Sequence, residues 1–234
     1  MYEDLIIDPG HGGIDSGAVG PTGLKEKDIN LKLALNVGKF LSLQGLAINY
    51  TRKTDTQLVS GNKVKDLETR AKLANDAKAK YFLSIHINSA ENSAATGTET
   101  YAYKQGGEGE KLAKAVNDSL AAAIKLPNRG VKFTNFSVLR DTAMPAALTE
   151  VCFISNPKEE ALLKDEAFLE KTAKAIALGF MDFIGKSYQE SNPEHWAEKH
   201  YNSLIAKGII INEKRFDDPI TRGEVFALLD QIVK

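Results

Sequence analysis

Short apolar runs alternate with amphipathic segments through most of the chain, and this alternation leaves few folds open to it. The runs that read as strands are LIID, LAINYTR, YFLSIHIN, TETYAYK and AALTEVCFI. Consecutive strands separated by helices pair mostly in parallel, with right-handed crossovers, which is typical of an α/β domain. We therefore predict an α/β fold in which helices flank a mostly parallel, twisted sheet.

Helical patterns follow most of these runs. We expect helices over about residues 27–43, 64–79, 108–125 and 157–186. The first stops near Gly45, the third ends before Pro127, and Asn156-Pro157 begins the last. A loop that contains NRG is expected to lead through FSVLR to the final strand.

A polar, proline-containing stretch, YQESNPE, separates the α/β region from a short tail. We assign residues 1–186 to the main domain, 187–193 to a linker and 194–234 to the tail. The tail reads as two short amphipathic helices around a turn at RFDDP, a unit too small to bury much core alone. We expect this small C-terminal helical appendage to dock on the main domain or on a copy of itself.

Charge and hydropathy exclude several classes of protein. A formal net charge of −1 leaves no basic surface of the kind that binds nucleic acid. No apolar run approaches the roughly 20 residues of a membrane span. No signal sequence precedes LIID, so we expect a protein made in the cytoplasm without an encoded leader. The single cysteine, Cys152, excludes an internal disulfide and has apolar neighbours, which predicts a buried, inert thiol.

Two of the four histidines lie at the ends of predicted strands. His11 follows LIIDPG, and His86 lies in FLSIHIN just before a loop. In parallel α/β sheets, ligands collect beyond the carboxyl ends of the strands, so both imidazoles can meet in one cleft. Taken alone, either histidine is more often a hydrogen-bonded structural residue.

Two carboxylates fit the same cleft. Glu26 occupies the first turn of a predicted helix, where the macrodipole stabilises negative charge and where it could simply bind free amides. Glu150 interrupts AALTEVCFI, a run otherwise suited to a buried strand, and a buried charge needs a partner. A salt bridge from Glu150 to Arg140 or Arg70 is the structural alternative to a catalytic role.

Together these residues have the composition of a mononuclear zinc hydrolase site. Catalytic zinc commonly takes three histidine or carboxylate ligands and leaves a fourth position to water, so we assign the ligands to His11, Glu26 and His86. The metal lowers the pKa of the water and polarises a carbonyl, while Glu150 moves the proton to the leaving amine. Glycines in PGHGG allow a sharp turn beneath the ligand. Asp8 either orients the ligands or only forms the turn.

Five sequence blocks, in order across about residues 4–186, resemble the zinc-dependent N-acetylmuramoyl-L-alanine amidases of the Amidase_3 type. The blocks are DPGHGGIDSGAVGPTGLKEKDINL, ETRAKLAN, YFLSIHINS, NRGVKFTNFSVLR and PAALTEVCFISNPKEEALL. The resemblance implies hydrolysis of the amide that joins the lactyl group of N-acetylmuramic acid to L-alanine of the peptidoglycan stem peptide.

The same resemblance implies roles for individual residues of this sequence. It implies that the zinc ligands are His11, Glu26 and His86 and that the catalytic glutamate is Glu150. Recurrent family positions with structural or substrate-orienting roles fall on Arg70, Asn75 and Asn88.

The tail is similar to a single S-layer-homology unit. The residues that carry this likeness are His195, Trp196, Ala197, the Lys-Gly-Ile turn, Phe216 and the segment Ile220-Thr221-Arg222-Gly223-Glu224. Such units resemble modules that attach proteins to secondary polymers of Gram-positive walls, which implies wall binding through Trp196 and Arg222. Packing in a small core and capping of a helix are the structural alternatives for these two residues.

We therefore expect a zinc-dependent peptidoglycan amidase of the phage endolysin type, acting at the cell wall. A bacterial autolysin deprived of its leader is a second form of the same hypothesis. A stem-peptide endopeptidase and a non-catalytic wall-binding protein stay open as alternatives. The expected partners are peptidoglycan and, through the tail, a secondary wall polymer or further copies of the chain, without nucleic acid.

Overall fold

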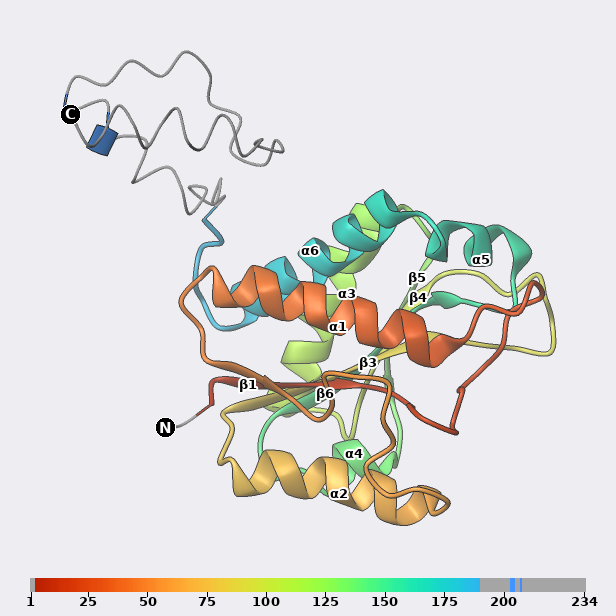
Figure 1. Ribbon diagram of the computed structural model, residues 1–234, viewed down its shortest axis with the longest axis horizontal. Helices are drawn as coiled ribbons and strands as arrows, with labels where there is room; N and C mark the ends of the chain where they lie inside the picture. The colour runs from red at the N-terminus through yellow and green to blue at the C-terminus, as the bar shows by residue number, and fades with distance from the viewer. Residues whose placement is uncertain (1–2, 190–202, 205–206, 208–234) are drawn as a thin grey trace, which may run out of the picture. The chain divides into compact units, whose positions relative to one another are not determined.

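A computed structural model of the chain describes residues 3–189, 203–204 and 207. Within residues 3–189, which belong to the compact unit Met1–Gln189, one six-stranded sheet lies between two layers of helices (Figure 1). This arrangement confirms the predicted α/β fold with helices on both faces of a mostly parallel sheet. Trp196 and Arg222 lie outside the described residues, and the linker and the helical appendage stay predictions.

The sheet has the strand order β2-β1-β3-β6-β4-β5. The strands are β1 (Leu5–Pro9), β2 (Ile48–Tyr50), β3 (Tyr81–Asn88), β4 (Thr98–Ala102), β5 (Asn128–Phe133) and β6 (Ala146–Phe153). Strands β2, β1, β3 and β6 are parallel, whereas β4 runs antiparallel to β6 and carries β5 parallel to itself. The reversal follows from the loop 89–97, which contains no helix and returns the chain from the end of β3 directly into β4.

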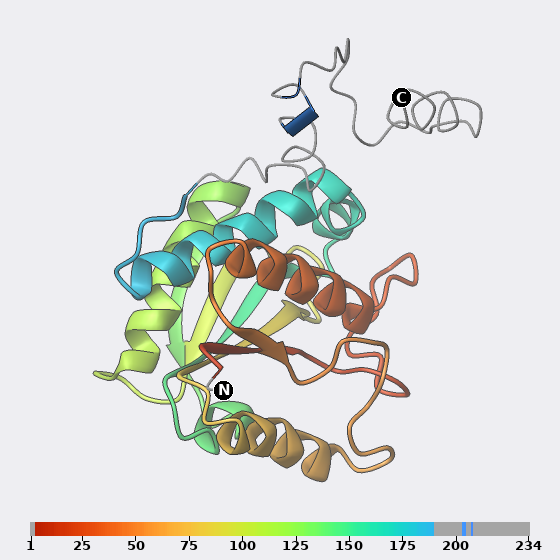
Figure 2. The ribbon, with the colours of Figure 1, turned by 60° about the vertical axis from the view of Figure 1, so that its left-hand side comes forward.

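Helices cover both faces of the sheet, with α1, α3 and α6 on one face and α2 and α4 on the other (Figure 2). The helices are α1 (Glu26–Ser42), α2 (Lys63–Asp76), α3 (Glu108–Ile124), α4 (Ser137–Arg140), α5 (Pro157–Leu163) and α6 (Glu166–Phe183). In α1 the apolar residues Ile29, Leu33, Val37 and Leu41 recur every four positions and are buried. Burying each such side chain contributes about 1.5–3 kcal/mol, so this stripe fixes which face of α1 meets the sheet.

The segment predicted as a loop through NRG is strand β5, and FSVLR contains the short helix α4. Within the part of the chain that the structure describes, strand β5 pairs on one side only, with β4. Its residues are exposed or half-exposed, so it lacks the apolar alternation of a central strand. Gly130, which suggested a turn, adopts a φ of 78° where the register between β4 and β5 shifts. Such an irregularity in a strand is a role that glycine performs readily.

The last helix of the unit, predicted as one element over 157–186, is divided into α5 and α6. Asp165 is the N-cap residue of α6, and its side chain accepts a hydrogen bond from the backbone N–H of Ala167. Asp165 lies inside a segment whose pattern predicts one continuous helix, but as an N-cap residue it begins a second helix there.

Candidate metal centre

The loop that follows β1 brings His11 against His86 through a strained turn. His11 has a φ of 61°, in the left-handed region that residues other than glycine seldom adopt, at a cost of about 1–3 kcal/mol. A Cβ atom on Gly10 would meet the ring of His86 at 2.1 Å, so only glycine permits this close approach. The two imidazole rings consequently lie 5.0 Å apart, edge to face.

The carboxylate of Glu26, at the start of α1, lies between the two rings. Its Oε2 atom is 3.2 Å from His11 Nε2, and its Oε1 atom is 2.9 Å from His86 Nδ1. One donor atom from each of the three residues falls within 4.8 Å of the other two. Two imidazole nitrogens and one carboxylate are the kind of donor set that catalytic zinc takes, so the residues fit that metal. The structure thus brings together the three ligands predicted from the sequence.

Hydrogen bonds fix Glu26 in this place. The backbone N–H of Ala18 donates to Oε2, and the backbone N–H of Ile87 and Asn30 Nδ2 donate to Oε1. Burial opposes ionisation of Glu26, but the bonds from His11 and His86 outweigh it and hold its pKa well below the usual range. An ionised carboxylate between two imidazoles is suited to a dication.

Asp15 holds the outer nitrogen of the first ligand. His11 Nδ1 lies 2.9 Å from Asp15 Oδ2, so His11 Nε2 is the nitrogen that faces Glu26. A carboxylate on the far nitrogen of a metal-binding histidine orients the ring and raises its basicity. Sequence reasoning missed Asp15, although an aspartate four residues after His11 in a glycine-rich loop was the available signal.

Asp8, for which the sequence leaves a ligand-orienting role and a turn-forming role open, is buried in a network beneath the loop. Its oxygens accept hydrogen bonds from Thr51, Ser84 and Arg70. Arg70 also donates to the backbone carbonyl of His11 at 2.7 Å. Asp8 and Arg70 therefore support the turn that carries His11, rather than contacting the imidazole of His11 or His86.

Asp15→Asn is expected to weaken zinc binding by about 10–100-fold. The amide oxygen of asparagine accepts a weaker hydrogen bond from His11 Nδ1 than the carboxylate does, so it orients the imidazole less firmly. Competition against a chromophoric zinc chelator measures the change in Kd. Asp76→Asn is the matched control, since Asp76 forms an exposed ion pair with Lys72 on α2, away from the candidate ligands. An unchanged Kd in Asp15→Asn would refute the orienting role.

Arg70→Met is expected to lower the free energy of unfolding by roughly 3–5 kcal/mol, the range for removing one member of a buried ion pair. The Arg70 side chain is 2% exposed, and it forms ion pairs with both Asp8 and Asp66. Methionine would fill the space while leaving two buried carboxylates unpaired. Urea unfolding measures the loss. Lys72→Met, which breaks an exposed pair on the same helix, should change the unfolding midpoint little.

Glu150 lies beside the three candidate ligands, because it pairs with His86 across β3 and β6. Neither arginine considered from the sequence neutralises it: Arg140 pairs with Asp141, and Arg70 pairs with Asp8 and Asp66. Its Oε2 atom is buried and has no hydrogen-bond partner among the described residues. Burial, with the nearby charges of Glu26 and Glu99, raises the pKa of Glu150 well above its usual value.

The two asparagines singled out from the sequence have different surroundings. Asn75 on α2 donates to the Asp141 carbonyl and accepts from the Ala143 N–H, so it holds the loop before β6. Asn88 donates to Glu99 at 3.0 Å. Glu99, a buried glutamate on β4 next to Glu150, was not identified from the sequence, since TETYAYK alternates in the manner of any strand.

Cys152 is free and buried in β6. Burial raises the pKa of its thiol well above the usual value, which agrees with an inert side chain. Among the described residues, no helix is long and apolar enough to cross a membrane.

The chain is similar to known proteins over most of its length. A family model described as N-acetylmuramoyl-L-alanine amidase, Amidase_3, matches residues 5–182. The germination-specific N-acetylmuramoyl-L-alanine amidase of Bacillus subtilis (strain 168) is 35% identical, with 77% of this chain and 79% of that protein covered. An endolysin of Bacillus phage SPP1 is 36% identical over 91% of this chain and 78% of its own length.

A solved structure shows the same architecture. The catalytic domain of CwlV, an N-acetylmuramoyl-L-alanine amidase from Bacillus (Paenibacillus) polymyxa var. colistinus, aligns with a TM-score of 0.73 and 40% identity. The alignment covers 80% of this chain and 100% of that domain.

Proposed function

Since the chain belongs to the family of N-acetylmuramoyl-L-alanine amidases, we propose that His11, Glu26 and His86 bind its catalytic zinc ion and that Glu150 is its general base. The family supplies the reaction: the enzyme hydrolyses the amide between N-acetylmuramic acid and L-alanine in peptidoglycan. The observation that carries the assignment of residues is the placement of Glu150 directly beside His86 in the sheet.

In this reaction His11, Glu26 and His86 hold the metal, and Glu150 moves a proton. Bound zinc supplies Lewis-acid chemistry, polarising the scissile carbonyl and making water more acidic. Glu150 accepts the proton of the attacking water and delivers it to the nitrogen of L-alanine as the amide breaks. Glu150 is placed for this transfer because it lies beside His86 and its buried Oε2 atom has no hydrogen-bond partner among the described residues.

We further propose that the enzyme acts as a phage-type endolysin. The similarity to the Bacillus phage SPP1 endolysin spans 91% of the chain and so extends beyond the family match at residues 5–182. Similarity to bacterial amidases supports the second form of the hypothesis, a bacterial autolysin. In either form the tail is proposed to bind a secondary wall polymer through Trp196 and Arg222, or to associate with further copies of the chain.

Mass spectrometry of peptidoglycan digested by the protein tests the proposed reaction. The expected products are glycan strands with a free lactyl carboxylate and stem peptides with a free L-alanine amino group. Intact lactyl–peptide linkages beside cut peptide bonds would establish an endopeptidase instead. Undigested wall from several bacterial sources would favour the non-catalytic wall-binding alternative.

A further inference from the structure

A row of charged side chains crosses the sheet from the candidate metal centre toward its β5 edge. His86 pairs with Glu150 on the neighbouring strand, and Glu150 pairs in turn with Glu99 on β4. Side chains at paired positions of neighbouring strands point to the same face, so these three lie side by side. Phe82 precedes His86 on β3, and Leu148 precedes Glu150 on β6, by an even number of positions, so both lie on the same face as the row, and they pack in the core on the α2 and α4 side. The row therefore lies on that side of the sheet.

Glu99, at the far end of this row, is the buried centre of a polar cluster. The other members of the cluster are Asn88, Tyr101, Arg129 and Lys132. The Oε1 atom of Glu99 accepts hydrogen bonds from Asn88 Nδ2 at 3.0 Å and Tyr101 Oη at 2.6 Å. Its Oε2 atom accepts from Arg129 Nε and Lys132 Nζ, both at 2.6 Å. These four bonds use the acceptor sites of the carboxylate. The Glu99 side chain is 3% exposed, but those of Arg129 and Lys132 are each 39% exposed.

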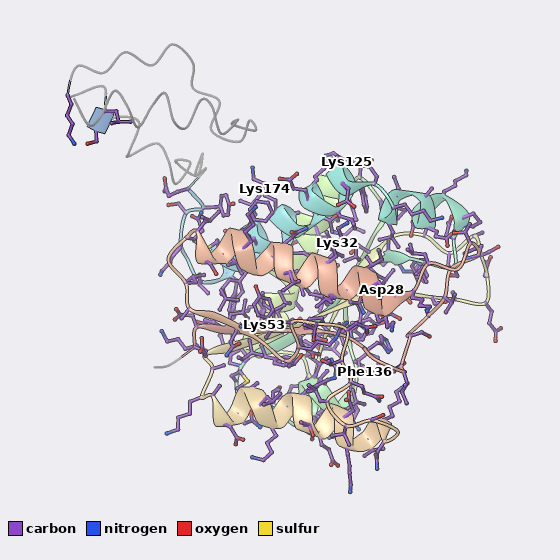
Figure 3. All side chains as sticks on the ribbon, viewed as in Figure 1. Asp28, Lys32, Lys53, Lys125, Phe136 and Lys174 are labelled. Carbon is purple, nitrogen blue, oxygen red and sulfur yellow. The ribbon has the colours of Figure 1, made fainter. Side chains whose placement is uncertain are left out.

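Aromatic rings hold the two cations in position. The guanidinium of Arg129 lies 5.1 Å from the ring centroid of Phe153, and the Lys132 ammonium lies 5.9 Å from that of Tyr101. The ring centroids of Tyr101 and Phe136 are 5.4 Å apart. Phe136 lies on the α2 side of the sheet, away from Lys32 and Lys174 (Figure 3). The cluster is thus ordered before any ligand arrives, which lowers the entropic cost of binding one.

The cluster carries one excess positive charge. Burial opposes ionisation of Glu99, but bonds from Lys132, Tyr101 and Arg129 bring its pKa down to about 2, so it is ionised at neutral pH. One carboxylate therefore faces two cations. Among the described residues, neither Arg129 nor Lys132 forms an ion pair with a second carboxylate. Neutralising Glu99 requires one cation, and the charge of the other is left for an anion from outside.

The substrate of the proposed reaction is charged on one side of the scissile amide only. The lactyl carboxyl is consumed in that amide and the hydroxyl and N-acetyl groups of the glycan are neutral, whereas the stem peptide retains carboxylates. We propose that Arg129 and Lys132 form a subsite that binds a carboxylate of the stem peptide. The peptide half of the substrate then lies over β4 and β5, and the sugar half lies on the other side of Glu150. This inference rests on the proposed function and adds the direction in which the substrate binds.

Two soluble muramoyl-peptide substrates test the subsite, one with free peptide carboxylates and one with every carboxylate converted to an amide. The wild type is expected to prefer the free form by about tenfold or more in kcat/KM, as a hydrogen bond to a charged group implies. Arg129→Gln and Lys132→Gln should each slow cleavage of the free form by about tenfold and leave the amidated form unchanged. The preference of the wild type should therefore disappear in the variants.

Two further variants separate substrate binding from folding. Lys132→Arg keeps the positive charge and should retain the preference. Lys111→Gln removes a lysine that also pairs with a glutamate, but from α3 on the other face, and should leave both rates unchanged. Equal cleavage of the two substrates by the wild type, or equal slowing of both in the Arg129 and Lys132 variants, would overturn the subsite. A wild type that cleaves neither substrate would refute the proposed function instead.

Discussion

Replacing Glu150 with glutamine is expected to lower kcat/KM for amide hydrolysis by about 10²–10⁴-fold, the range typical of a lost general base, while zinc binding is retained. Glutamine has nearly the shape of glutamate but cannot accept the proton of the attacking water. Zinc binding should persist because the ligand atoms belong to His11, Glu26 and His86. Loss of wall turbidity and release of L-alanine amino groups measure the rate, and metal analysis of the purified variant measures the zinc.

The stability of this variant provides an independent check. Burial raises the pKa of Glu150 above its value in the unfolded chain. A carboxyl whose pKa rises on folding stabilises the protein fully only below its unfolded pKa, and this contribution is lost as the pH rises through the folded pKa. Glu150 therefore opposes folding of the metal-free protein at neutral pH, and metal-free Glu150→Gln should be at least as resistant to urea as the parent.

Glu108→Gln, on the exposed surface of α3, is the matched control and should leave activity unchanged. Inactivity of Glu150→Gln accompanied by loss of zinc or of the folded state would mean that Glu150 is structural. Retention of more than about a tenth of the wild-type kcat/KM would rule out its role as the base.

Removing zinc is expected to reduce activity on the order of 10³-fold or more, because nothing else in the site can bring the pKa of water from 15.7 toward about 7. Dialysis against a strong chelator, followed by graded addition of zinc, measures this effect. Activity should return in proportion to bound zinc up to one ion per chain. Magnesium should not restore it, since that ion prefers six oxygen ligands over imidazole nitrogen.

The same titration should show zinc stabilising the fold, because an ion that binds only the native state adds to the free energy of unfolding by mass action. Glu26→Gln should lose both effects, since the amide supplies no negative charge between the imidazoles of His11 and His86. Asp28→Asn, on the same turn of α1, is the control. A rise in Tm with zinc in Glu26→Gln equal to that in the wild type would place the ion elsewhere.

The central strands could be predicted from the sequence because strong local patterns mark them, whereas the three candidate ligands follow from their joint positions at the ends of elements and from the resemblance to the amidase family. Strands β1, β3 and β6 are apolar and buried throughout most of their length. His11, His86 and Glu150 interrupt or end those runs, where a polar residue is costly without a function. Glu26 opens a helix whose apolar stripe is unmistakable.

What could not be predicted depends on contacts between distant segments. Strand β5 pairs only at the sheet edge, so its residues need not alternate in polarity. Glu99 becomes significant only because antiparallel pairing of β4 with β6 sets it beside Glu150. Asn30, one turn after Glu26, orients the carboxylate by a hydrogen bond that the helical pattern alone does not reveal.

The position of zinc in crystals of the full chain, located by its anomalous X-ray scattering, tests whether His11, Glu26 and His86 bind the metal. We predict one zinc peak bound by His11 Nε2, His86 Nδ1 and the Glu26 carboxylate, at the distances of about 2.0–2.2 Å usual for such ligands. Zinc bound elsewhere in catalytically active crystals, with no ion bound to these three side chains, would contradict this assignment.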